Sequence, residues 1–109
     1  MAQFDIHRNK GAQKQAIPYV VVVQSAQFDR YRRRVVVPLM RRSVLPTGAP
    51  LSGTRLNPVF IVEGVEVVLH PLDTVSAALD QLAEPIGSLA EQGQQIADAM
   101  DELLTRSWG

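Results

Sequence analysis

Two features of this chain are suited to chemistry: a cluster of arginines and a tryptophan near the end. The cluster contains Arg30, Arg32, Arg33, Arg34, Arg41 and Arg42. Guanidinium groups bind phosphates and carboxylates through paired hydrogen bonds, so the cluster suits an anionic ligand or partner. We favour the alternative interpretation, a charged strand edge that prevents edge-to-edge aggregation.

The tryptophan is Trp108, the only one in the chain, and Gly109 is the one residue after it. An indole at the end of a predicted helix is either tucked back onto the protein or presented to a partner, because in water it gains nothing from burial. Tryptophan is enriched among residues that carry binding energy at interfaces, so we predict a contact with a partner. A disordered tail is the alternative.

Catalytic signatures are missing from the sequence. His7 and His70 lie far apart at predicted strand ends, and there is no H-x-x-x-H, glycine-rich phosphate loop or nucleophile elbow. The chain has no cysteine, which excludes disulfides and the usual thiolate ligands of zinc and iron–sulfur clusters. Asp98, Asp101 and Glu102 fit the solvated face of one helix. We therefore predict a protein that is not an enzyme and has no cofactor or metal site.

Length and charge define the class of protein further. A chain of 109 residues suits one domain over residues 1–109 with a single core. Eleven basic and eleven acidic side chains cancel, so overall charge does not favour direct binding of nucleic acid. The sequence shows no signal peptide and no apolar run of roughly 20 residues. These observations predict a cytoplasmic protein without a membrane partner.

The first half of the chain predicts strands. Alternation predicts a half-buried strand over residues 1–8, with Phe4 and Ile6 on one face and His7 on the other. A run rich in β-branched residues predicts a central strand at residues 18–24.

Further strands are predicted on both sides of a long loop. Residues 33–39 read as a strand that Pro38 should weaken or end, because proline cannot donate a ladder hydrogen bond. Residues 41–58, with three prolines and two glycines, predict one long loop that is functional or mobile. Two apolar runs around Glu63 and Gly64 predict a tight hairpin.

The end of the chain predicts a helix. Helical spacing of apolar residues extends from Ser88 to about Thr105, and Ser88 with Glu91 fits a capping box. Residues 75–82 also suit a helix by propensity alone. Strands joined by short turns predict a mostly antiparallel sheet, so the fold class is α+β with one C-terminal helix.

A series of short motifs, in one order along nearly the whole chain, resembles the CcdB family of toxins. The motifs are Met1-x-Gln-Phe4, Tyr19-x-Val-x-Val-Gln-Ser25, Arg34-Val-Val-Val-Pro-Leu39, the Glu63-Gly64 hairpin, Pro71-Leu-Asp-Thr-Val-Ser76, Ala83-Glu-Pro-Ile86 and the C-terminal helix. The resemblance implies a small curved, mostly antiparallel sheet of the CcdB/MazF-like barrel type with one long C-terminal α-helix. It also favours a short strand and turn, rather than a helix, at residues 75–82.

The same resemblance implies a function. It implies a homodimeric toxin of a type II toxin–antitoxin system that binds the DNA gyrase A subunit and traps the cleaved-DNA complex. A CcdA-like antitoxin would neutralise it, and nucleic acid would be contacted only through the antitoxin complex, in autoregulation of transcription. Plasmid maintenance is the biological role that this implies.

Gyrase-binding residues follow from matching the family's terminal Trp-Gly-Ile, whose indole stacks on a gyrase arginine, and the two residues after the Val-Gln-Ser-x stretch. Alignment by the tryptophan selects Trp108 and Gly109, and the Val-Gln-Ser-x stretch selects Gln27 and Phe28. Alignment by the apolar positions of the helix places the triplet on Thr105, Arg106 and Ser107 instead. Stacking of an indole on a guanidinium contributes roughly 0.5–2 kcal/mol.

An antitoxin segment that folds on binding is expected to dock on the loop at residues 9–16 and the loop at residues 41–58. The candidate residues are Asn9, Lys10, Lys14, Arg41, Arg42 and Arg55.

Two alternatives remain open. The MazF toxins, similar in fold to CcdB, cleave RNA with arginine and an acid, threonine or histidine; the candidates here are Arg33, Arg34, His70 and Asp73. The second alternative is a relative that keeps the fold and antitoxin binding but no longer poisons gyrase.

Overall fold

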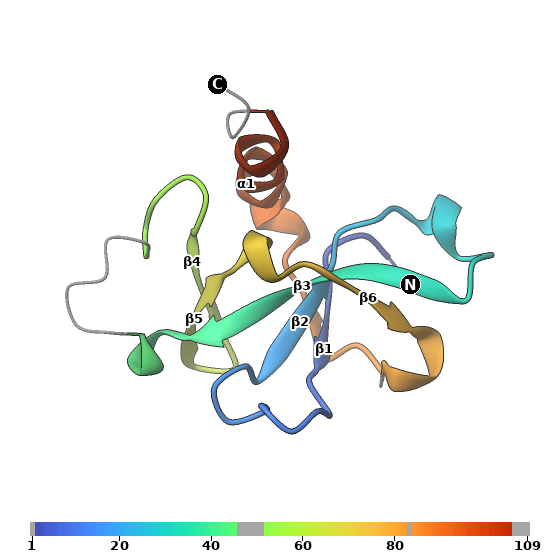
Figure 1. Cartoon of the computed structure of the whole chain (residues 1–109), viewed down its shortest axis with the longest axis horizontal. Helices are drawn as coiled ribbons and strands as arrows, with labels where there is room; N and C mark the ends of the chain where they lie inside the picture. The colour runs from blue at the N-terminus through green and yellow to red at the C-terminus, as the bar shows by residue number, and fades with distance from the viewer. Residues whose placement is uncertain (1, 46–51, 83, 106–109) are drawn as a thin grey trace.

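The computed structural model describes residues 2–45, 52–82 and 84–105, which form a curled antiparallel sheet and one helix (Figure 1). The strands are β1 (Asp5–Arg8), β2 (Tyr19–Val22), β3 (Arg33–Arg41), β4 (Val59–Val62), β5 (Val65–Leu69), β6 (Val75–Ala78) and β7 (Gly87–Ser88). The helix is α1 (Gly93–Thr105), and the short 3-10 turns are η1 (Ala26–Phe28), η2 (Arg42–Val44), η3 (Pro71–Asp73), η4 (Leu79–Gln81) and η5 (Ala90–Gln92). The strand order is β4-β5-β3-β2-β1-β7, and β6 also pairs with β3. The predicted α+β class and antiparallel sheet are confirmed.

The long strand β3 organises the sheet, and it continues through Pro38. Its pairing along one side changes from β6, opposite Arg33–Val36, to β5, opposite Leu39–Arg41. Pro38 falls between these two ladders, and its carbonyl accepts from the His70 N–H at 3.0 Å. Of the two predicted effects, weakening or ending the strand, the ending is wrong: β3 continues to Arg41, because Pro38 lies where the partner strand changes.

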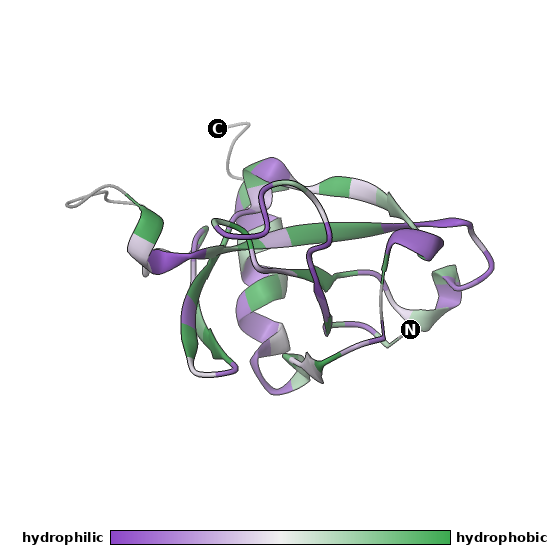
Figure 2. Cartoon of the chain, turned by 90° about the horizontal axis from the view of Figure 1, so that it is seen from below, coloured by the Kyte–Doolittle hydropathy of each residue, from purple (hydrophilic) through white to green (hydrophobic). Residues whose placement is uncertain are grey.

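The core lies between one face of the sheet and α1, which crosses β3 (Figure 2). Its buried members are Ile6, Tyr19, Val21, Val37, Leu39, Phe60, Val62, Val67, Leu69, Leu89, Ile96 and Ala99. Along β2 and β3 these residues alternate, as the period of a strand requires. On α1 the two fully buried side chains are three residues apart, so they lie on one helical face.

The first strand differs from its prediction. It begins at Asp5, because Phe4 has a left-handed backbone with φ of 70°. His7, predicted on the polar face, is fully buried opposite Val20, and Ile6 is buried on the other face. The alternation of polar and apolar residues could not reveal the burial of His7, because segments distant in the sequence cover that face of the strand.

Two local predictions are confirmed. Val62 pairs with Val65 across the hairpin, and both turn residues, Glu63 and Gly64, have positive φ, as a tight two-residue turn of this type requires. Residues 75–82 form β6 and η4 rather than a helix, because pairing with β3 outweighs local propensity.

The helix begins later than predicted. Ser88 belongs to β7, where it pairs with Asp5, and its hydroxyl accepts from the Ala90 N–H at 3.0 Å. The 3-10 turn η5 follows, and α1 starts only at Gly93. The predicted capping box of Ser88 with Glu91 is therefore wrong. Ser88 pairs with β1 as part of a strand, so it does not cap α1.

The first residue of α1 is a glycine, and the Phe4 ring occupies the space that a side chain at this position would need. A Cβ on Gly93 would lie 2.5 Å from Phe4 Cε2. We expect Gly93→Ala to destabilise the fold by about 1–3 kcal/mol, since overpacking outweighs the gain in helix propensity. Urea unfolding measures this change.

The matched control for that substitution is Gly87→Ala, whose Cβ would meet only Ile6 Cδ1, at an ordinary 3.8 Å. We expect it to change stability by less than about 0.5 kcal/mol. Combining Gly93→Ala with Phe4→Leu should recover part of the loss. Equal stability of the Gly93→Ala variant and the wild type would contradict the clash.

Candidate protein-binding site

The turn η1 presents two of the predicted gyrase-binding residues, Gln27 and Phe28. Ser25 precedes it as the N-cap, and the Ser25 hydroxyl accepts from the Gln27 N–H at 3.4 Å. Phe28 is 39% exposed, and its ring lies 5.9 Å from that of Tyr31, which is 63% exposed. The turn therefore places a pair of aromatic rings in contact with solvent.

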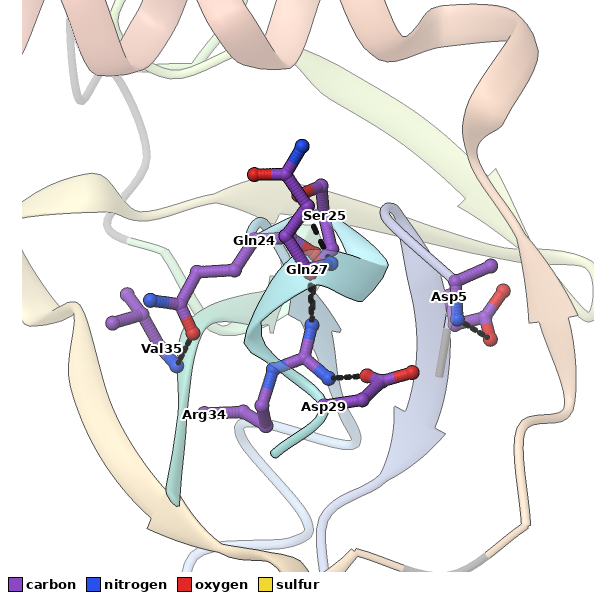
Figure 3. Close-up of polar contacts among 8 residues, drawn as sticks. Asp5, Gln24, Ser25, Gln27, Asp29, Arg34 and Val35 are labelled. Atoms are coloured by element: carbon purple, nitrogen blue, oxygen red, sulfur yellow. Dashed lines mark hydrogen bonds and ion pairs between the residues drawn. The ribbon is translucent and has the colours of Figure 1, made fainter. Parts of the chain in front are cut away.

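Arg34 anchors this turn from beneath (Figure 3). Its side chain is fully buried and forms an ion pair with Asp29. The same guanidinium donates to the carbonyls of Gln24 and Ser25 at 2.9 and 3.0 Å. Three contacts from one rigid, planar group fix the backbone on both sides of η1. The sequence assigned this arginine to a surface cluster, whereas the structure makes it the support of the aromatic turn.

Tyr31 is the residue of this surface that the sequence reasoning missed. A mostly apolar hollow of about 420 Å³ lies beside the two rings. It is lined by Gln24, Phe28, Tyr31, Arg32 and Arg33. Exposed tyrosine next to arginine is the composition of interface hot spots. The available signal was an aromatic residue inside the arginine run.

The other predicted gyrase-binding residues lie at the end of α1. Thr105 is its last residue and donates its hydroxyl to the Asp101 carbonyl, one turn earlier. Arg106, Ser107, Trp108 and Gly109 lie outside the described residues. Figure 1 shows the end of α1 projecting beyond the sheet, apart from η1.

The predicted antitoxin-binding residues divide between two places. Arg41 joins the loop at residues 9–16, because its N–H and its Nε donate to the carbonyls of Ala16 and Gln15. Asn9 closes the same loop by donating to the Ile17 carbonyl at 2.7 Å. The structure thus brings Arg41 beside the loop that carries Asn9, Lys10 and Lys14.

The remaining two arginines have acidic partners within the chain. Arg42 pairs with Glu66 at 2.7 Å. Arg55 reaches α1, where it lies 3.8 Å from Asp98 and 3.5 Å from Glu102. Arg55 is therefore separate from the other candidates, and these two acids pair with it rather than forming only a solvated face.

Glu63 ties the hairpin to the first two strands. Its carboxylate accepts from the Tyr19 hydroxyl at 2.7 Å and pairs with Arg8 at 2.7 Å. The hydrogen bond from Tyr19, together with Arg8, lowers the pKa of Glu63 below its usual range. Burial and the adjacent carboxylate raise the pKa of Tyr19.

These shifts predict a stability that depends on pH. A lowered carboxyl pKa stabilises the fold above the ordinary value of about 4.3, and this contribution is lost as the pH falls below it. We expect the difference in free energy of unfolding between wild type and Glu63→Gln to be largest near neutral pH and to shrink in acid. Urea unfolding across this range measures it, with Glu91→Gln as the exposed control. A constant difference would contradict the linkage.

The four residues of the nuclease alternative are not one site. His70 Nδ1 lies 3.2 Å from Asp73, whereas Arg33 binds Ser76 and Arg34 binds the η1 turn. His70 is beside Pro38, four residues along β3 from Arg34, or about 13 Å. Among the described residues, no group of three or more histidine, cysteine or acidic side chains could hold a metal ion.

The fold and these surfaces define a small α+β protein that presents an aromatic and arginine-rich turn. The profile of the CcdB protein family matches residues 3–106, and the chain belongs to this family. Membership supports a toxin of a toxin–antitoxin system, with an antitoxin as partner. No curated protein matches the chain. No helix in the described segments is long and apolar enough to cross a bilayer.

Proposed function

We propose that this chain is a cytoplasmic toxin that binds the DNA gyrase A subunit and traps the complex of gyrase with cleaved DNA. It acts by binding and not by catalysis, as a single domain over residues 1–109 that forms a homodimer. Its antitoxin prevents the gyrase contact. The observation that carries the proposal is the family match over residues 3–106.

The geometry of η1 supports this target. Phe28 and Tyr31 provide exposed aromatic area, and Arg34 fixes the turn before any partner arrives. A rigid turn loses little conformational entropy on binding, so its contacts contribute more to affinity. A twofold dimer would present two copies of the turn to a twofold target and so add avidity.

A DNA-cleavage assay with purified gyrase tests the proposal. Addition of the chain should increase linear DNA after denaturation of the enzyme, while a labelled RNA incubated with the same protein stays intact. Cleaved RNA without trapped gyrase would replace the proposal with the nuclease. No effect in either assay, with a stable antitoxin complex, would favour the relative that no longer poisons gyrase.

A further inference from the structure

On the face away from the core, two parts of the curled sheet approach each other without pairing, and we call the gap between them the seam. One side of the seam is β6 with η4, and the other is the turn at residues 8–11. Between them lies a groove of about 470 Å³, with Val20 and Val36 among its lining residues. The side chain of Val75, on the rim, is 53% exposed. The groove is therefore an apolar channel beside a strand.

The strand at the rim, β6, pairs on one side only. Its described partner is β3, and Leu79 donates to the Arg32 carbonyl at 3.0 Å just after the strand. Because bonded and non-bonded pairs alternate in an antiparallel ladder, Val75 and Ala77 face β3. Ser76 and Ala78 then direct their backbone N–H and C=O groups toward the seam. This edge offers hydrogen bonds to one more strand.

Arg33 covers part of that edge. Its guanidinium donates to the Ser76 hydroxyl at 2.6 Å and to the Ser76 carbonyl at 2.5 Å. Charged side chains at an edge prevent uncontrolled strand pairing. A strand that displaced Arg33 would free an exposed guanidinium, with which a carboxylate of that strand can pair, and this favours an acidic partner.

The opposite rim also selects an acidic partner. No aspartate or glutamate occurs between Asp5 and Asp29, whereas this stretch contains Arg8, Lys10 and Lys14. Arg8 and Lys10 line the groove, and Asp80 is its one acidic lining residue. Because Arg8 already pairs with Glu63 at 2.7 Å, Lys10 is the cation of this rim on which the choice of a negatively charged segment relies.

We propose that this seam binds an extended, acidic segment of the antitoxin, which adds a strand to the outer edge of β6. Apolar side chains at alternate positions enter the groove over Val20 and Val36. Acidic side chains on the same segment pair with Lys10 and with the displaced Arg33. Main-chain bonds to Ser76 and Ala78 provide affinity, as in other strand additions. The inference rests on the proposed function, because it takes the antitoxin as the occupant.

A synthetic peptide probes the seam directly. The probe is a blocked decapeptide of alternating glutamate and valine, and its control replaces each glutamate with lysine. We expect the acidic peptide to slow hydrogen exchange at residues 76 and 78 of the full chain, and the lysine peptide to have no such effect. A gyrase-trapping assay on the same preparation reports separately on the proposed function.

Two substitutions at one position isolate the edge hydrogen bonds. Ser76→Pro removes the outward N–H while leaving the β3 ladder intact, and Ser76→Ala removes only the hydroxyl. We expect the proline variant to bind the acidic peptide roughly three- to tenfold more weakly than the alanine variant. Lys10→Glu should also weaken this binding, whereas Lys14→Glu, outside the groove lining, serves as its control.

Several outcomes would overturn the inference while leaving the proposed function standing. These are no slowed exchange at β6, equal binding by the two Ser76 variants, or equal binding of both peptides. Slow exchange at β6 without peptide, together with a dimer that Ser76→Pro dissociates, would assign the seam to a second copy of the chain. Failure to trap gyrase would count against the proposed function alone.

Discussion

Arg34→Met is expected to destabilise the protein by about 3 kcal/mol, because a buried arginine supports three separate groups. The methionine keeps most of the apolar stem but removes the donor to the carbonyls of Gln24 and Ser25, and it removes the ion pair between Arg34 and Asp29. For a domain of this size, the loss corresponds to a fall in Tm of roughly 10–20 °C. Calorimetry and urea unfolding measure it.

The matched control is Arg32→Met, two residues earlier on an exposed part of the same run. We expect it to change stability by less than about 0.5 kcal/mol. The Arg34→Met variant should also bind gyrase more weakly, since η1 loses the group that fixes it. Equal stability of the two variants would show that Arg34 does not support the turn.

Trp108→Ala is expected to abolish most gyrase trapping without changing stability. Truncation of a tryptophan hot spot typically costs at least about 2 kcal/mol, or roughly thirtyfold in affinity per site. Because a homodimer would engage through two copies, the effect on trapping should exceed the value for one site. Titration of the gyrase A subunit and growth after induction of each variant measure the two effects.

Controls distinguish the indole from the tail as a whole. Trp108→Phe keeps an aromatic ring and should retain part of the affinity, whereas deletion of Gly109 tests the last position. Unfolding by urea should be the same for all three proteins. Toxicity of Trp108→Ala equal to wild type would show that gyrase is contacted elsewhere, with Phe28 and Tyr31 as the next residues to replace.

The chemistry of the binding surface could be predicted from the types of residue in the arginine run, but the position of each side chain could not. The sequence identified the arginine run as suited to an anionic partner, and Arg33 at the rim of the seam remains in that role as a proposal. Arg34, from the same run, is a buried support. Neighbours along a strand point to opposite faces, so a run of identical side chains must divide between solvent and interior. Which member is buried depends on η1.

The positions of the predicted antitoxin-binding residues could not be read from the sequence either. Local sequence placed Arg41 and Arg55 in one long loop, but the first lies beside the loop at residues 9–16 and the second beside α1. Loop length carries no information about where its two ends dock. Only the packing of the sheet against the helix separates them.

The sequence by itself determined the class of fold, because β-branched runs, a Glu63-Gly64 turn and helical spacing are encoded within a few residues of each other. Tertiary structure decided the features that depend on distant partners: a strand that continues through Pro38, a buried His7, a helix that starts at Gly93 and an open edge on β6. Each depends on which segment covers or pairs with another, and hydrogen bonding and burial across the sheet outweigh local preference.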